Sequence, residues 1–252
     1  MTIPTYEVIA LKMGELEVDK STITYATDFG KLIKVPIWSA LIRGGEHKII
    51  VDTGIHSREW VNENVAPTKQ TEIEKIENAI KTAAGWDVDD VDIVINTHLH
   101  YDHCGGNQLF KKARFYVQQA EWEHAHDPIE SQKWIYNDTS FLFDPPGVDY
   151  FAWHFLQGDS EILPGIKILH TPGHTPGGQT VLVKTKEGTV AITGDAANIM
   201  ENIEKRIPVG ILSDTDQFFK SLDKIKPFAA SAICGHEQSI EPFQEKGFPR
   251  LT

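Results

Sequence analysis

His98, His100, Asp102 and His103 occupy four of six consecutive positions, a dense arrangement of side chains that bind metals. Imidazole and carboxylate groups together suit zinc, iron, manganese or cobalt better than calcium or magnesium alone. A metal held by such groups brings the pKa of a bound water toward neutrality and provides a nucleophile without serine or cysteine. This segment therefore predicts a metal centre with hydrolytic chemistry.

The spacing within this segment suggests how the ligands are shared. Alternate side chains of an extended chain point to one side, so we expect His98, His100 and Asp102 to point together from a strand end. His103 breaks the alternation and requires a turn. We therefore assign His98 and His100 to one metal and Asp102 with His103 to another.

Four further candidate residues, Asp52, His174, Asp195 and His236, each lie within two residues of a glycine in a short turn. Glycine allows tight turns and lets the backbone approach a metal closely. A carboxylate can bridge two metals, and two metals about 3.5–4 Å apart can activate water and stabilise a leaving oxygen. The full set thus predicts a dinuclear site.

The elements that must position these residues are short strands with a few helices between them. The β-branched segment 91–95 predicts a buried strand that leads into the histidine segment, as α/β folds place ligands at strand ends. Apolar patterns predict further strands over 6–11, 35–42, 48–51, 114–117, 166–169, 179–183, 189–193 and 229–233, and helices over 71–84, 118–126 and 217–225.

Residues 127–150 stand apart as an aromatic-rich insertion. This segment contains Trp134, Tyr136, Phe141 and Phe143. Insertions of this kind often form the wall of a pocket, although the same aromatics could simply pack a helix onto the core. No linker or repeat divides the chain, so we expect one domain over residues 1–252, with two sheets flanked by helices.

Composition restricts the classes of partner. The chain has 252 residues and a net charge of −12, which disfavours nucleic acid and anionic membranes. Cys104 and Cys234 are the two cysteines, without a CxxC motif, and they predict buried packing rather than a disulfide framework. The N-terminal segment has no basic region followed by an apolar stretch, the pattern of a secretory signal, and we therefore expect a cytoplasmic protein.

In the candidate residues named above, from Asp52 through the histidine segment to His236, and in their order along the chain, the sequence resembles the metallo-β-lactamase superfamily over residues 52–236. The resemblance implies an α/β fold, a four-layer αββα sandwich of two mixed sheets with the site along one edge. It implies His98, His100 and His174 on a first metal, Asp102, His103 and His236 on a second, and Asp195 bridging them. Asp52 would orient a histidine ligand from outside the coordination sphere.

Within this superfamily, segments 98–107 and 194–203 are most similar to the quorum-quenching N-acyl homoserine lactonases. That resemblance implies attack of a metal-bridging hydroxide on the lactone carbonyl, with Asp102 passing a proton to the leaving alkoxide. Many such lactonases have a tyrosine three residues after the bridging aspartate, where this chain has Asn198. Asn198 is our second candidate catalytic residue, and Tyr25, Tyr101 or Tyr136 could replace the missing phenol.

Other branches of the superfamily provide the alternatives. A glyoxalase-II-type thioester hydrolase would share the ligands, but it usually has a C-terminal helical region, and only residues 237–252 follow His236 here. An iron-dependent sulfur dioxygenase is a further alternative. We expect a hydrolase that opens lactone rings with two divalent metals, with zinc favoured over iron, manganese or cobalt. Its partners would be a small lactone or ester and, as a candidate assembly, a second copy in a homodimer.

Overall fold

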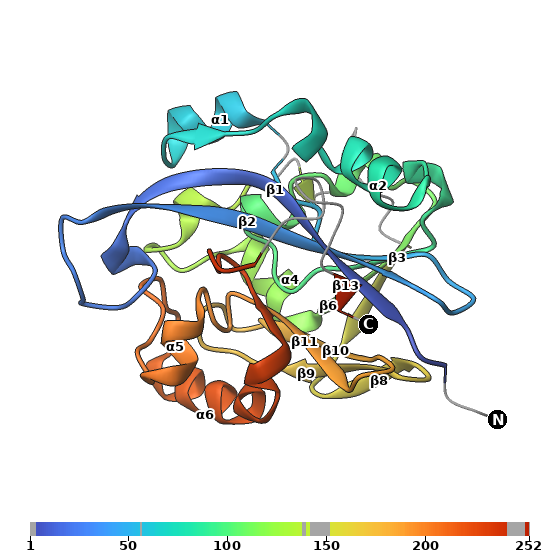
Figure 1. Cartoon of the computed structure of the whole chain (residues 1–252). Coiled ribbons are helices and arrows are strands. Elements are labelled where there is room, and N and C mark those ends of the chain that lie inside the picture. Colours follow the sequence, from blue (N-terminus) through green and yellow to red (C-terminus); the bar gives the residue numbers. More distant parts are fainter. Residues whose placement is uncertain (1–3, 56, 138–139, 142–151, 241–249, 252) are drawn as a thin grey trace.

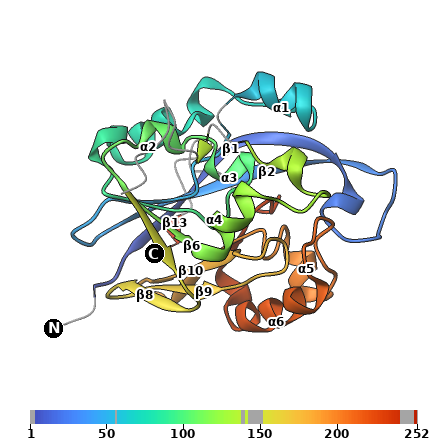
Figure 2. The same cartoon turned by 180° about the vertical axis from the view of Figure 1, so that it is seen from behind.

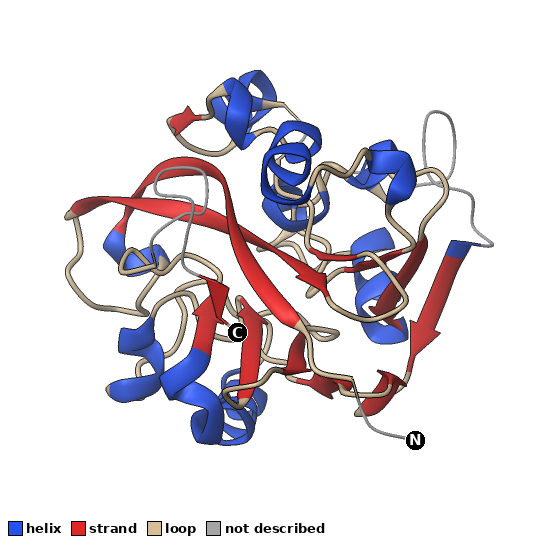
Figure 3. Ribbon diagram, turned by 45° about the vertical axis from the view of Figure 1, so that its right-hand side comes forward, coloured by secondary structure: helices blue, strands red, loops and turns tan. Residues whose placement is uncertain are grey.

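Two β-sheets packed face to face form the centre of the fold, and helices cover the outer side of each (Figure 1). The computed structural model describes residues 4–55, 57–137, 140–141, 152–240 and 250–251. Figure 3 shows the strands between an upper and a lower group of helices. The predicted αββα sandwich is confirmed.

The first sheet has the strand order β13-β1-β2-β3-β5-β6-β7, with β4 also paired to β1. Its strands are β1 (Glu7–Asp19), β2 (Leu32–Arg43), β3 (Ile49–Val51), β4 (Thr68–Lys69), β5 (Ile93–Ile95), β6 (Arg114–Gln118), β7 (Trp153–Leu156) and β13 (Arg250–Leu251). The second sheet has the order β12-β11-β10-β9-β8. Its strands are β8 (Ser160–Leu163), β9 (Ile166–His170), β10 (Gln179–Lys184), β11 (Thr189–Gly194) and β12 (Ala232–Cys234).

The helices divide between the two outer layers. They are α1 (Arg58–Asn64), α2 (Ile76–Ala84), α3 (Tyr101–Cys104), α4 (Gln119–His126), α5 (Met200–Glu204) and α6 (Thr215–Ile225). Helices α1 and α2 cover the first sheet, and α5 and α6 lie on the side of the second sheet (Figure 1). None of the helices in the described part of the chain is long and apolar enough to cross a membrane.

Three buried apolar clusters hold the layers together. Along β1, Val8 belongs to the cluster between the sheets, whereas its neighbour Ile9 belongs to the cluster under the helices of the first sheet. This alternation is what a strand produces when both of its faces are buried. A third cluster, which includes Phe218 and Leu222, packs α6 onto the second sheet.

Most predicted elements are present, although several of their boundaries differ. The helix predicted over 71–84 begins only at Ile76, because Glu74 accepts hydrogen bonds from the backbone and hydroxyl of Thr71 in a separate 3-10 turn. Gly85 ends that helix in the left-handed conformation, with φ at 72°. The strand predicted over 229–233 is shorter, because residues up to Ser231 form a 3-10 turn.

The topology brings the candidate residues to one edge. Strands β3 and β5 are parallel neighbours in the first sheet, and β11 and β12 are parallel neighbours in the second. Asp52 follows β3, the histidine segment follows β5, Asp195 follows β11 and His236 lies just beyond β12. Parallel strands end at the same edge, so these residues meet there.

Candidate metal centre

The turns at this edge bring five histidines and two aspartates into one buried cluster. Three overlapping groups have ligand atoms within 4.8 Å of one another. They are His98 with His100 and His174; His98 with His103 and Asp195; and Asp102 with His103 and His236. The structure therefore brings together every residue that the sequence nominated as a metal ligand.

One expected feature of the histidine segment is wrong. Strand β5 ends at Ile95, and Asp102 lies on the short helix α3 rather than on an extended strand end, whereas the turn expected at His103 is present in the same helix. The backbone N–H groups of His103 and Cys104 both donate to the carbonyl of His100, which begins this helical turn. In a helical turn, unlike in a strand, adjacent side chains do not point to opposite sides. Asp102 and His103 can therefore both reach the cluster.

The first half of the cluster is a set of three converging imidazoles. His100 Nδ1 lies 3.0 Å from His98 Nε2 and 3.0 Å from His174 Nε2. Burial lowers the pKa of all three histidines, and for His98 and His100 the shift is large. These side chains are therefore neutral at physiological pH, the form in which imidazole binds a metal.

The second half combines two imidazoles with carboxylates. Asp102 Oδ2 lies 3.8 Å from His103 Nε2 and 3.6 Å from His236 Nε2. Asp195 lies between the halves, with Oδ1 3.3 Å from His103 Nε2 and Oδ2 3.4 Å from both His174 Nε2 and His236 Nε2. Burial alone would raise the pKa of Asp195, but His236 and His103 hold it well below its usual range.

Hydrogen bonds fix the outward nitrogen of four of these five histidines. His103 Nδ1 lies 2.8 Å from Asp52 Oδ2. Carbonyl oxygens accept from two more of the rings, that of Ile211 from His174 Nδ1 at 2.8 Å and that of Pro36 from His236 Nδ1 at 2.9 Å. The fourth ring, that of His98, lies beside the Thr97 hydroxyl. A ring that donates outward leaves its other nitrogen free to bind a metal.

Asp52 extends this arrangement to His98 through Thr97. The Thr97 hydroxyl donates to Asp52 Oδ2 at 2.7 Å, and its oxygen lies 3.2 Å from His98 Nδ1. The Thr97 backbone N–H also donates to Asp52 Oδ1 at 2.7 Å. Asp52 thus orients residues of both halves from outside the cluster.

Unpaired polar atoms inside the cluster test whether a metal fits. His103 Nε2 and Asp195 Oδ1 are fully buried, and neither has a hydrogen-bond partner within the described ranges. Buried polar atoms without partners are costly. Nitrogen and carboxylate donors that converge in this way are a suitable ligand set for a divalent transition metal.

Close packing at the site explains two of its glycines. A Cβ atom on Gly235 would lie 2.1 Å from Asp195 Oδ1, and one on Gly194 would lie 2.3 Å from Thr97 Oγ1. Any side chain at these positions would displace a candidate ligand or its support. Glycine at these two positions thus permits the close approach of the backbone to Asp195 and Thr97.

A cavity of about 260 Å³ opens onto the cluster. Its floor includes His100, Asp102, His174, Asp195 and His236, and its walls are mainly apolar. The walls include Leu16 and Val18 of β1, Val65, Pro67, Tyr101, Trp134, Ile135 and Ile211. The contribution of β1 was missed because its strand was predicted to end at residue 11, although the apolar residues 13, 16 and 18 continue the pattern.

The predicted aromatic insertion contributes part of this wall. Trp134 and Ile135 line the cavity, while Tyr136 and Phe141 are buried in the core under the first sheet. Phe143 and the rest of segment 142–150 lie outside the described residues.

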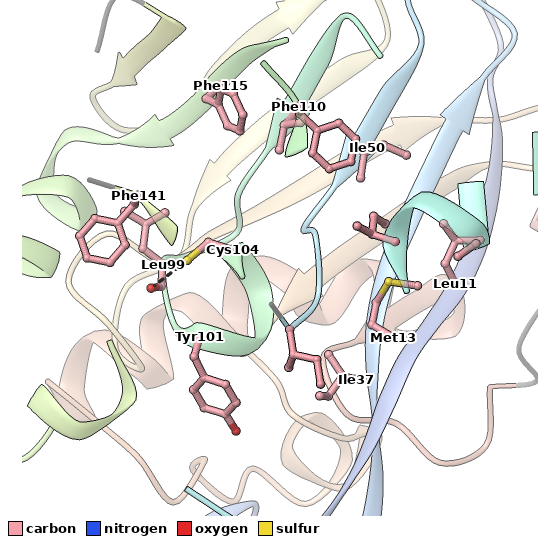
Figure 4. Packing of buried hydrophobic residues seen from close by; sticks show 14 of the residues in the cluster. Leu11, Met13, Ile37, Ile50, Leu99, Tyr101, Cys104, Phe110, Phe115 and Phe141 are labelled. Atoms are coloured by element: carbon pink, nitrogen blue, oxygen red, sulfur yellow. Dashed lines mark hydrogen bonds between the residues drawn. The ribbon is translucent and has the colours of Figure 1, made fainter. Parts of the chain in front are cut away.

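Asn198 and three tyrosines were the candidates for contact with substrate. Asn198 lines the cavity and is 3% exposed, and its Oδ1 has no partner among the residues the structure describes. Tyr101 also lines the cavity and points away from the core residues Leu99 and Cys104 in Figure 4. Tyr25 is 55% exposed and is not among the cavity residues. Tyr136 donates its hydroxyl to a buried glutamate, Glu121, at 3.1 Å.

Comparisons with known proteins agree with this geometry. The family model described as "Metallo-beta-lactamase superfamily" matches residues 32–236. An N-acyl homoserine lactonase of Bacillus sp is 34% identical, covering 84% of each chain, and one of Bacillus cereus is 32% identical, covering 93% of this chain and 92% of that one. The solved structure of an N-acyl homoserine lactone hydrolase, with the product N-hexanoyl-L-homoserine bound at its catalytic metal centre, is 30% identical. It has a TM-score of 0.81 and covers 97% of this chain and 99% of its own.

Proposed function

Because the chain belongs to the metallo-beta-lactamase superfamily, we propose that it is a metal-dependent hydrolase that opens lactone rings, with N-acyl homoserine lactones as its substrates. The observation that carries this proposal is the buried cluster of five histidines and two aspartates at the floor of an apolar cavity. Relatives that match most of the chain are named as lactonases, which supports the choice of a cyclic ester.

We assign the ligands to two ions, and zinc is the metal we favour for this donor set. His98, His100 and His174 would hold the first ion, and Asp102, His103 and His236 the second. Asp195 is the residue proposed to bind both, since its carboxylate lies within 3.4 Å of His174 in the first half and of His103 and His236 in the second. When bound, such ions lower the pKa of water and polarise a carbonyl group.

The chain's own residues would then position the lactone and move a proton. The apolar walls exclude water and receive the acyl chain, and the Asn198 amide is placed to hydrogen-bond a polar group of the substrate. Water adds to the carbonyl carbon, and the bond between that carbon and the ring oxygen breaks. Asp102, which lines the cavity beside His236, would carry the proton from the water to the ring oxygen.

A substrate panel tests this proposal. Metal-loaded protein is assayed with N-hexanoyl homoserine lactone, γ-butyrolactone and an acyl-glutathione thioester, and the acid released by each is titrated. We expect ring opening of the acyl homoserine lactone, and its loss in His103→Ala and Asp195→Asn variants that remain folded. Thioester cleavage without lactone opening would overturn the proposal in favour of a thioesterase.

The role proposed for Asn198 has its own readout. Replacing Asn198 with alanine removes the amide but leaves the ligand set intact. We expect a higher KM for the acyl homoserine lactone and an unchanged metal content. An unchanged KM would remove Asn198 from the substrate contacts.

A further inference from the structure

Glu121 is a buried carboxylate outside the proposed ligand set, and it bonds three separate segments around the cluster. It lies on α4 with no solvent exposure. Its Oε1 accepts the Leu99 N–H at 2.9 Å and the Tyr136 hydroxyl at 3.1 Å, and its Oε2 accepts the Gly177 N–H at 3.3 Å. A buried carboxylate is costly unless hydrogen bonds satisfy it, so these bonds are strong constraints on the segments that donate them.

Two of the donors belong to the segments that carry the first three histidines. Leu99 lies between His98 and His100, and Gly177 lies three residues after His174. The contact with Gly177 is tight, because a Cβ atom there would lie 2.1 Å from the backbone nitrogen of Glu121. One carboxylate thus sets the distance between the two segments that supply His98, His100 and His174.

The third donor, Tyr136, controls the orientation of His100. His100 Nε2 is buried and lacks a hydrogen-bond partner in the described part of the structure, unlike the outward nitrogens of the other four histidines. Instead its ring packs edge-on against Tyr136, with centroids 4.7 Å apart and an interplanar angle of 75°. Because the Tyr136 hydroxyl is bonded to Glu121, the carboxylate fixes the ring on which His100 rests.

A neighbouring contact strengthens the same side of the site. Gln132, also fully buried, donates its amide to the carbonyl of His174 at 2.8 Å, and His124 of α4 lies 3.0 Å from the Gln132 side-chain oxygen. Both α3 and α4 are visible on the side of the molecule shown in Figure 2. Helix α4 is therefore the support for the loop that carries His174.

We infer that Glu121 is a positioning residue for the metal ion held by His98, His100 and His174. The inference rests on the proposed function in requiring a metal at that place. Glu121 has a counterpart in Asp52, which bonds His103 of the second half directly and reaches His98 of the first half through Thr97. Two buried carboxylates outside the proposed ligand set then support the cluster without binding the metal.

Metal binding by the Glu121→Gln variant tests this inference. The substitution keeps the shape but replaces one acceptor oxygen by an NH₂ group, which would face N–H donors of Leu99 or Gly177. We expect the affinity for one of two ions to fall about 10–100-fold. Dialysis against a chelator would then leave about one ion per chain where the wild type keeps about two. Cobalt-loaded protein should also lose part of its visible absorption.

Two further variants make the test specific. Glu123→Gln is the matched control, since Glu123 lies on the same helix but is exposed and accepts a bond only from Gln119 among the hydrogen bonds seen there. It should bind metal as the wild type does. Tyr136→Phe keeps the ring and both backbone bonds but removes the hydroxyl, and we expect a smaller loss of affinity for the same ion.

The outcomes separate this inference from the proposed function. Two ions bound with wild-type affinity in both Glu121→Gln and Tyr136→Phe would overturn it. If Glu121→Gln does not fold, the Tyr136→Phe variant alone decides the question. Weaker metal binding by Tyr136→Phe would then support the inference, and unchanged metal binding would overturn it. Wild-type protein that binds two ions but opens no lactone would refute the proposed function, while the Glu121 result would still stand because its readout is metal binding.

Discussion

Replacing Asp52 by asparagine tests the support of the His103 side of the site. Asp52 has a backbone φ of 58°, in the left-handed region, and its carboxylate accepts bonds from the Thr97 N–H, the Thr97 hydroxyl and His103 Nδ1 at 2.7–2.8 Å. Asparagine tolerates this backbone conformation as well as aspartate does. The Asp52→Asn change therefore isolates the loss of one acceptor oxygen and its charge.

The size of the effect follows from the groups that face the new amide. If the amide NH₂ faces His103 Nδ1, the ring must either lose its bond or move its proton to Nε2, the atom that faces Asp195. Losing a hydrogen bond to a charged group costs about 1.5–3 kcal/mol. A proton on Nε2 would block the metal, and we expect about 10–100-fold weaker binding of one ion.

The assay is urea unfolding of the metal-free protein together with metal competition against a chelator. Asp92→Asn is the control, because Asp92 is an exposed carboxylate that accepts a backbone N–H from Lys48. The proposed role of Asp52 is refuted if the unfolding free energy of Asp52→Asn lies within ~0.5 kcal/mol of that of the wild type and the variant binds both ions with unchanged affinity.

Three other predictions concern packing and metal removal. Gly173→Ala would place a Cβ 2.4 Å from the Phe218 Cα, and we expect this clash to lower the unfolding free energy by about 2–4 kcal/mol. Gly188→Ala is the control, because Gly188 also has a positive φ but faces open space; an equal loss of stability in both variants on urea unfolding would argue against the clash. Cys104 and Cys234 are fully buried, and burial raises the pKa of Cys234 to about 12, so neither thiol should react with iodoacetamide at pH 8 until the protein unfolds; rapid labelling of the folded protein would contradict this. Removing metal should lower the melting temperature, since a ligand at 100 times its Kd stabilises the folded protein by about 2.7 kcal/mol. Calorimetry with and without a chelator measures this change, and an unchanged melting temperature would show that the centre does not bind metal.

The residues that the structure gathers in the cluster could be found in the sequence because each has a local signature. Asp195 and His236 directly follow glycines at strand ends, and Asp52 lies two residues before Gly54 at another. The parallel pairs β3–β5 and β11–β12 then place those ends together. The sequence could not show the carbonyl partners of His174 and His236, because any residue supplies a backbone oxygen and only the tertiary structure chooses it.

Glu121 and the helical placement of Asp102 were missed for a different reason. A glutamate in a short helix resembles a solvated surface residue, and its burial depends on Leu99, Tyr136 and Gly177 meeting it from distant segments. The alternation of His98, His100 and Asp102 fits a strand, but the turn at His100 starts a helix within the same few residues. Local pattern does not decide between these two conformations over so short a run.

The most direct test of the central claim is the rate of ring opening of N-hexanoyl homoserine lactone measured against the number of metal ions bound per chain. We expect no ring opening above background in metal-free protein and a maximal rate as binding approaches two ions per chain. A full rate in metal-free protein, or no ring opening in protein that holds two ions, would contradict it.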